Sequence, residues 1–100
     1  MKRFPSLILA FAVCLAGCGS PQIGVNPEAF EAIDALYTAV SLHDAKLVET
    51  CEANLKKLRD DKKLPEAAGK TLDDIIARTR DTKWEDAQTR LGDFMRGQRR

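Results

Sequence analysis

Apolar residues follow two different patterns along this chain. Residues 4–16 form an almost unbroken apolar run, whereas beyond residue 26 apolar residues recur every three or four positions among charged ones. A short continuous run near the start is typical of an export signal, and the wider spacing is that of helices buried along one face. No stretch alternates apolar and polar residues, so no strand is predicted. We therefore expect an all-α domain behind an N-terminal signal peptide.

Start signals divide the helical region into four short helices. Asn26, followed by Pro27, and Asp44 are N-cap residue types ahead of the first two helices. Pro65 is expected at the first position of the third, and residues 82–85 (TKWE) fit a capping box for the fourth. Each helix carries an apolar stripe that is expected to join one core: Phe30, Ile33, Leu36, Tyr37 and Val40; Leu47, Val48, Cys51, Leu55 and Leu58; Ala68, Leu72, Ile75, Ile76 and Thr79; Trp84, Ala87, Leu91, Phe94 and Met95.

The two halves of the helical region are similar to each other. Leu36 matches Ile75 at an offset of 39 residues, and Cys51 matches Leu91 at an offset of 40. The turn at 81–87 (DTKWEDA) resembles the turn inside a tetratricopeptide-type repeat, where an aromatic residue and then an alanine open the second helix. The period is longer than the roughly 34 residues of that repeat, and its inter-helix glycine is missing. We expect four antiparallel helices arranged as two helical hairpins, only loosely similar to that family.

The end of the apolar run carries a processing signal. Lys2 and Arg3 precede the run, and the run is shorter than the about 20 residues that a membrane-spanning helix needs. It ends in Leu15-Ala16-Gly17-Cys18, which closely resembles the lipobox of bacterial lipoproteins. The resemblance implies that the Cys18 thiol receives a diacylglyceryl group, that the signal peptidase cuts between Gly17 and Cys18, and that the new amino group is acylated by a fatty acid such as palmitate.

This resemblance sets the expected domain organisation and address. Residues 1–17 are interpreted as the signal peptide, 18–26 as the lipidated cysteine and a tether, and 27–100 as the helical domain. An eight-residue tether would reach at most about 25–28 Å. Gly19 follows the lipidated cysteine, and a residue other than Asp at this position resembles lipoproteins that are sorted to the outer membrane. We therefore expect a membrane-anchored protein of the cell envelope, on the periplasmic face of the outer membrane if the host has two membranes.

Charge and candidate chemistry narrow the function classes. Without residues 1–17 the chain has 14 basic and 15 acidic residues, so no global field would steer it to nucleic acid. The single histidine, His43, falls at a predicted turn, whereas Cys51 lies in a core stripe, so a Cys–His catalytic dyad is not expected. Burial of Cys51 is favoured over an intermolecular disulfide. We expect no catalytic residues, cofactor or metal site, and a protein that is not an enzyme.

The expected function is therefore a membrane-anchored interaction or structural module of the envelope. Its partners would be membrane lipid, through acylated Cys18, and an unknown protein bound in the groove between the hairpins, with Glu31, Arg78 and Arg80 as candidate contacts. An envelope enzyme or enzyme subunit is the alternative. For Arg96, Arg99 and Arg100, interaction with the last helix's C-terminus is favoured over contact with lipid head groups.

Overall fold

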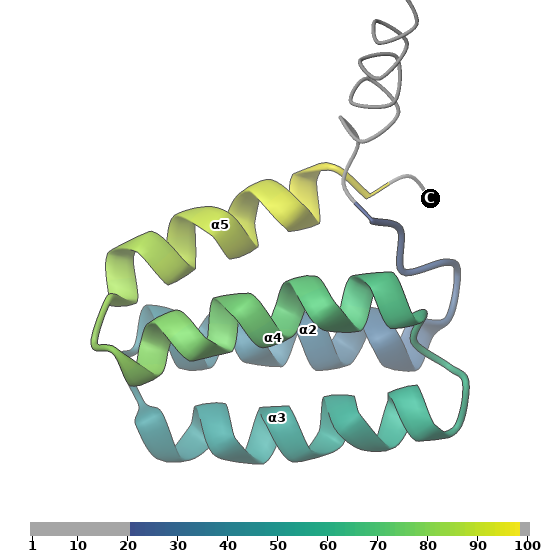
Figure 1. The fold of residues 1–100 in the computed structure, drawn as a ribbon, viewed down its shortest axis with the longest axis horizontal. Coiled ribbons are helices and arrows are strands. Elements are labelled where there is room, and N and C mark those ends of the chain that lie inside the picture. Colours follow the sequence, from purple (N-terminus) through teal and green to yellow (C-terminus); the bar gives the residue numbers. More distant parts are fainter. Residues whose placement is uncertain (1–20, 99–100) are drawn as a thin grey trace, which may run out of the picture.

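The computed structural model describes residues 21–98 and contains four α-helices (Figure 1). They are α2 (Pro27–Ser41), α3 (Ala45–Asp60), α4 (Glu66–Arg80) and α5 (Trp84–Arg96), and no strand occurs within 21–98. The expected all-α class is confirmed. The signal peptide, the cleavage after Gly17 and the lipidation of Cys18 concern positions outside the described residues. No helix in the described part of the chain is long and apolar enough to cross a membrane.

Consecutive helices run antiparallel, so the chain forms two hairpins, α2–α3 and α4–α5 (Figure 1). The hairpins join side by side, because α2 packs against α3 and α5 while α4 packs against the same two helices. Short turns connect α2 to α3 and α4 to α5 at one end of the bundle. The α3–α4 turn, the start of α2 and the end of α5 lie at the other end (Figure 1).

One continuous core fills the bundle. Most of the expected stripe residues are in it, including Leu36, Val40 and Leu91 with no exposed surface. Two large buried side chains lie outside the stripes: Leu64, in the α3–α4 turn, and Ile23, which is 2% exposed although it precedes α2. The remaining buried apolar residues are Ala29, Ala32, Ile33, Ala39, Val48, Leu55, Leu58, Ala68, Leu72, Ile75, Ile76, Ala87 and Phe94.

Six predicted core residues lie nearer the surface: Leu47 is exposed, and five pack against the core but are only partly buried, namely Phe30, Tyr37, Cys51, Trp84 and Met95. Leu47 is 42% exposed, because it stands about 100° around the helix from Val48, which takes the inward direction. Trp84 is half-buried, since it is the first residue of α5 and only part of its ring can reach the core at the end of the bundle. The ring stacks instead on His43, with ring centroids 5.1 Å apart and planes 10° from parallel. This contact joins the two hairpin turns.

The first two helix starts are as predicted. The side chain of Asn26 accepts a hydrogen bond from the backbone N–H of Glu28 at 2.8 Å, with Pro27 at the first helical position. Asp44 accepts from the N–H of Leu47 at 3.1 Å. Both side chains satisfy amides that have no partner inside the helix.

The other two helix starts differ from the prediction. Pro65 is the N-cap of α4 and not its first residue, and Lys83 is the N-cap of α5. The capping box at 82–85 is absent because Thr82 adopts a left-handed conformation (φ 61°) that ends α4. Its hydroxyl then donates to the carbonyl of Asp81 and cannot reach the amides of α5.

Candidate functional site

A groove runs between α3 and α4, the two helices where the hairpins meet on one side of the bundle. Its volume is about 720 Å³. Its floor is apolar and belongs to the core, whereas its rims are charged. The floor is made of Leu55, Leu64, Leu72 and Ile76; the rims carry Glu49, Glu52, Lys56, Arg59, Asp60, Glu66 and Asp73. The sequence interpretation placed a groove between the hairpins, and the structure has one there.

The rims of this groove are acidic. Five carboxylates face two cationic side chains along it, a formal charge of −3 in a chain whose total is +1. Lys56 and Arg59 are the two cations. Arg59 pairs with two of the carboxylates and Arg80 with a third, so Glu49 and Asp60 are the rim carboxylates without an ion pair among the described residues. A neighbouring segment with basic side chains would therefore meet a favourable potential here.

Arg59 crosses the groove from the last turn of α3 to the first turns of α4. Its guanidinium lies 2.6 Å from a carboxylate oxygen of Glu66 and 2.8 Å from one of Asp73, and its side chain is 19% exposed. Glu66 and Asp73 are seven residues apart, so they share one face of α4, two turns apart along the axis. One fork-shaped cation can therefore bind both.

Gly69 makes room for this arrangement. It stands between the two acidic positions, and a Cβ added there would lie 2.3 Å from Nε of Arg59 and 2.7 Å from its Cδ and Cζ. The absence of a side chain lets the arginine lie flat against the backbone of α4. Arg59, Gly69, Glu66 and Asp73 thus form one unit, which we name the Arg59 clamp.

The clamp keeps its acidic partner ionised. The hydrogen bond from Arg59, together with its charge, holds the pKa of the Glu66 carboxyl below the ordinary value. The pKa of Arg59 is raised in turn by its hydrogen bonds to Glu66 and Asp73. Both groups therefore stay charged through the neutral and mildly acidic range.

A second ion pair bridges α3 and α4 farther along the groove. Arg80, in the last turn of α4, pairs with Glu52 of α3. The hydrogen bond to Glu52 raises the pKa of Arg80. The hairpins are therefore joined by charged contacts near both ends of the groove, and the apolar floor lies between them.

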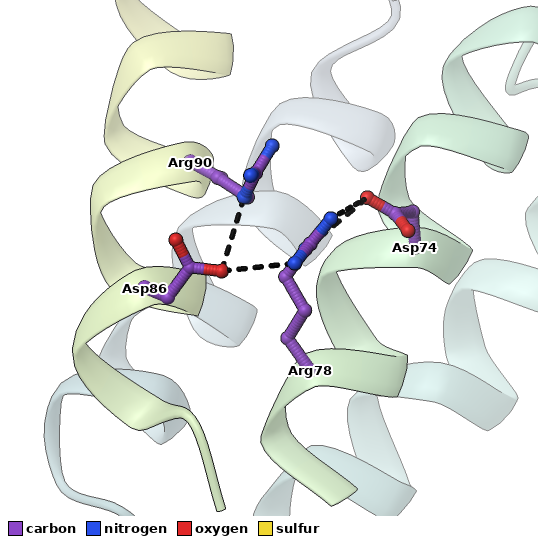
Figure 2. Close-up of polar contacts among 4 residues, drawn as sticks. All are labelled: Asp74, Arg78, Asp86 and Arg90. Atoms are coloured by element: carbon purple, nitrogen blue, oxygen red, sulfur yellow. Dashed lines mark hydrogen bonds and ion pairs between the residues drawn. The ribbon is translucent and has the colours of Figure 1, made fainter. Parts of the chain in front are cut away.

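Of the three candidate contacts from the sequence, the structure brings only Arg80 near the groove. Glu31 is on α2 and does not line it. Figure 2 shows Arg78 turned the other way, between Asp74 at 3.3 Å and Asp86 of α5 at 3.0 Å. Arg90 reaches the same Asp86 carboxylate at 3.1 Å. Arg78 thus helps to join α4 to α5.

Sequence reasoning missed the clamp. A lone glycine inside a helix pattern, seven-residue spacing of two acidic positions around it, and an arginine at the end of the previous helix are its only signals. None of them indicates which helix faces which, so the three could be combined only after α3 and α4 were known to be neighbours.

The sulfur and imidazole side chains are not brought together. His43 stacks on Trp84, whereas Cys51 is half-buried beside the core, and burial raises the pKa of its thiol. A raised thiol pKa lowers the thiolate fraction, which is the nucleophilic form. Within 21–98, no group of three or more His, Cys, Asp or Glu side chains is arranged to hold a metal ion.

Comparison with models of known protein families, with curated proteins and with solved structures finds no match to this chain.

Proposed function

We propose that the protein is a small bacterial lipoprotein, anchored by lipid on Cys18, that acts as a protein-interaction module of the cell envelope. The Leu15-to-Cys18 lipobox supports the anchor and the outer-membrane address expected from Gly19. The groove between α3 and α4 supports the interaction role. It combines an apolar floor with a charged rim on a surface that the two hairpins create together.

The acidic rim is the observation that carries the proposal. A partner that fits it is a short protein segment with basic side chains on both sides of apolar ones, so that the apolar groups reach the floor and the basic groups meet the rim carboxylates. Charge complementarity of this kind speeds association and selects among partners. Because the rim is exposed to solvent, its effect should weaken as salt shortens the screening length to less than about 8–10 Å.

Site-specific crosslinking tests the groove as the binding surface. A photo-reactive amino acid replaces Lys56 on the rim in one variant and Glu31, on the exposed side of α2, in a matched control. We expect a discrete crosslinked protein from intact cells with the first variant and not the second, and less of it at high salt in isolated envelopes. Equal crosslinking from both positions would contradict the groove.

Charge reversal then tests the rim itself. Glu49→Lys changes a rim carboxylate that makes no ion pair with the described residues, whereas Glu31→Lys changes the charge of the protein equally but outside the groove. We expect the first to reduce crosslinking at Lys56 and the second to leave it unchanged. If the isolated domain instead turns over an envelope substrate and no crosslink forms, the alternative of an envelope enzyme replaces this proposal.

The anchor has its own test. Intact mass spectrometry of the protein from cells should show loss of residues 1–17 and a lipid increment on Cys18. Cys18→Ala should keep residues 1–17 and carry no lipid. A wild-type protein that keeps residues 1–17 or lacks the lipid increment would contradict the anchor.

A further inference from the structure

Residues 21–23, expected to be part of a free tether, are bound to the end of the bundle. The side chain of Gln98 accepts from the backbone N–H of Ile23 at 2.8 Å and donates to the carbonyl of Pro21 at 2.9 Å. In return, the side chain of Gln22 donates to the carbonyl of Gly97 at 2.9 Å. The two glutamines thus connect residues 21–23 to residues 97–98, and we name this contact the Gln22–Gln98 clasp.

Burial of Ile23 in the core also holds residues 21–23 in place. Ile23 is 2% exposed and belongs to the core, and Asn26 caps α2. A segment with its main chain hydrogen-bonded and its largest apolar side chain buried cannot act as a flexible linker. Residues 21–26 are therefore part of the folded domain, and the expected boundary at residue 27 moves toward the N-terminus.

This shift shortens the connection to the proposed lipid anchor. Only residues 19 and 20 separate Cys18 from Pro21 in the sequence. Three residue steps span at most about 10–11 Å even when fully extended. By comparison, α2, with its 15 residues, is about 22 Å long. The anchor point is therefore closer to the clasp than the length of one helix.

The clasp lies on one end of the bundle, which we name the clasp end. The α3–α4 turn belongs to it, because Lys63 pairs with Glu28 in the first turn of α2 at 2.8 Å. Figure 1 shows this turn at the same end as residues 21–26. The opposite end carries the stacked rings of His43 and Trp84.

The clasp end presents an apolar side chain to solvent. Val25 is 82% exposed, the most exposed large apolar residue among those described, and it follows Gly24, whose positive φ of 81° sets the turn. Lys63 at this end pairs with Glu28 and Arg96 pairs with Asp93, whereas Lys62 in the α3–α4 turn makes no ion pair with the described residues. Contact of this surface with lipid would therefore rest on apolar burial at Val25, to which Lys62 adds attraction to head groups only where these are anionic.

We infer that the clasp end rests on the bilayer surface, with Val25 in contact with lipid and the His43–Trp84 end directed away from it. The inference rests on the lipid anchor proposed above. It orients the groove, whose Arg59 clamp, beside the α3–α4 turn, lies toward the membrane and whose Glu49 and Glu52 lie farther out. A partner must then reach to within about 22–24 Å of the bilayer, the length of one helix.

Quenching of tryptophan fluorescence by lipids with brominated acyl chains tests this orientation. The full-length lipidated protein is reconstituted into phosphatidylcholine vesicles as three forms: wild type, Val25→Trp and Leu42→Trp. Leu42 is a matched control because it is also an exposed aliphatic residue, 64% exposed, but lies in the α2–α3 turn at the other end. We expect the brominated lipid to quench the added fluorophore of Val25→Trp and to leave wild type and Leu42→Trp unquenched.

A longer spacer tests whether the short connection to Cys18 is what holds the clasp end at the bilayer, or whether this surface binds lipid by itself. Insertion of about ten glycine and serine residues between Ser20 and Pro21 adds a flexible coil and leaves the clasp intact. We expect the brominated lipid to quench Val25→Trp less when the insertion is present. Without the insertion, quenching of Val25→Trp in phosphatidylcholine vesicles should not depend on salt.

The outcomes distinguish the orientation from the anchor. Lipid on Cys18 with no quenching at Val25→Trp, or with equal quenching at Leu42→Trp, would overturn the orientation and leave the anchor standing. Absence of the lipid mass from the wild-type protein would overturn the anchor and the orientation with it.

Discussion

At the scale of single residues, the groove depends on what one position lacks. Arg59 can bind Glu66 and Asp73 together only because Gly69 has no Cβ in its path. Glycine inside a helix costs about 0.5–1 kcal/mol relative to alanine. Ion pairs at a solvent-exposed surface contribute little to stability, so the clamp does not add much beyond offsetting this cost. Its main effect is to set the shape and charge of the groove.

Comparison of two glycine substitutions tests this interpretation. Gly92→Ala places a Cβ no closer than 3.5 Å to Arg96 Nη1, so it should gain about 0.5–1 kcal/mol of unfolding free energy from helix propensity. Gly69→Ala should gain less, because the Cβ displaces Arg59 from its partners, and the pKa of Glu66 should rise toward its ordinary value. Urea unfolding and an NMR titration of Glu66 measure the two effects. Equal stabilisation by both substitutions, with the Glu66 pKa unchanged, would contradict the clamp.

The same carboxylates predict how stability depends on pH. The pKa of Glu66 is lowered by Arg59, and that of Asp86 by hydrogen bonding to Arg90 and by the charges of Arg90 and Arg78. A carboxyl with a lower pKa in the folded state stabilises that state above its unfolded pKa, about 4 for these groups, and loses this contribution as pH falls through the folded value. We therefore expect the free energy of unfolding to decrease as pH falls below about 4–5.

Substitution of Arg59 locates part of this effect. In Arg59→Gln the folded and unfolded pKa of Glu66 should become similar, so denaturant unfolding at a series of pH values should show a shallower acid dependence than wild type. An unchanged pH dependence would show that the pair contributes nothing to it.

At the scale of elements, the three turns between helices share one geometry. Each contains a residue with positive φ that is not glycine: His43 at 54°, Lys62 at 62° and Thr82 at 61°. In each turn the amide of this residue bonds three residues back and the next amide bonds five residues back, as from Asp44 to Ala39. These are Schellman-type endings, which usually place glycine at the left-handed position. The turns are therefore short and well bonded, but they carry local backbone strain.

Relief of this strain should stabilise the protein. The left-handed conformation costs about 1–2 kcal/mol for residues other than glycine, and a β-branched residue such as Thr82 is the least suited to it. We expect Thr82→Gly to raise the free energy of unfolding by about 1 kcal/mol after the added unfolded-state entropy of glycine is subtracted. Thr82→Ala is the control, since alanine keeps a Cβ. A loss of stability in Thr82→Gly would indicate that the Thr82 hydroxyl supports the turn more than its backbone conformation strains it.

At the scale of the whole molecule, the clasp closes the bundle by joining the two ends of the described chain. Gln98 makes hydrogen bonds to Ile23, Pro21 and Phe94, so one side chain connects the first described residues to the end of α5. It also keeps Ile23 over the core. The position of the clasp, and not of the first helix, therefore determines where the domain meets its spacer.

Loss of the clasp should loosen this end without unfolding the helices. Each of the three hydrogen bonds of Gln98 contributes about 0.5–1.5 kcal/mol, so Gln98→Ala should cost about 1.5–4.5 kcal/mol. The Ile23 amide should also lose its protection from hydrogen exchange. Gln88→Ala is the matched control, because the hydrogen bond of Gln88 to the Tyr37 hydroxyl is long, at 3.4 Å. Continued protection of the Ile23 amide in Gln98→Ala would show that burial alone holds the segment.

The sequence by itself determined the features that depend on near neighbours along the chain. The helical spacing of apolar residues predicted the four helices of residues 21–98, and Asn26 and Asp44 were identified as caps because a cap acts within three residues. The Leu15-to-Cys18 motif is local in the same way, and the lipid anchor that it implies remains a prediction.

Only the tertiary structure decided the features that join distant parts of the chain. Residues 82–85 have the sequence of a capping box, but Thr82 adopts the left-handed conformation that ends α4 and so does not cap α5. Trp84 has the spacing of a core residue, but the end of the bundle leaves it half-buried against His43. The clasp joins residues 75 positions apart, and the clamp needs two hairpins side by side. Sequence periodicity determines which face of each helix is buried, whereas the packing of the helices determines which polar groups meet across it.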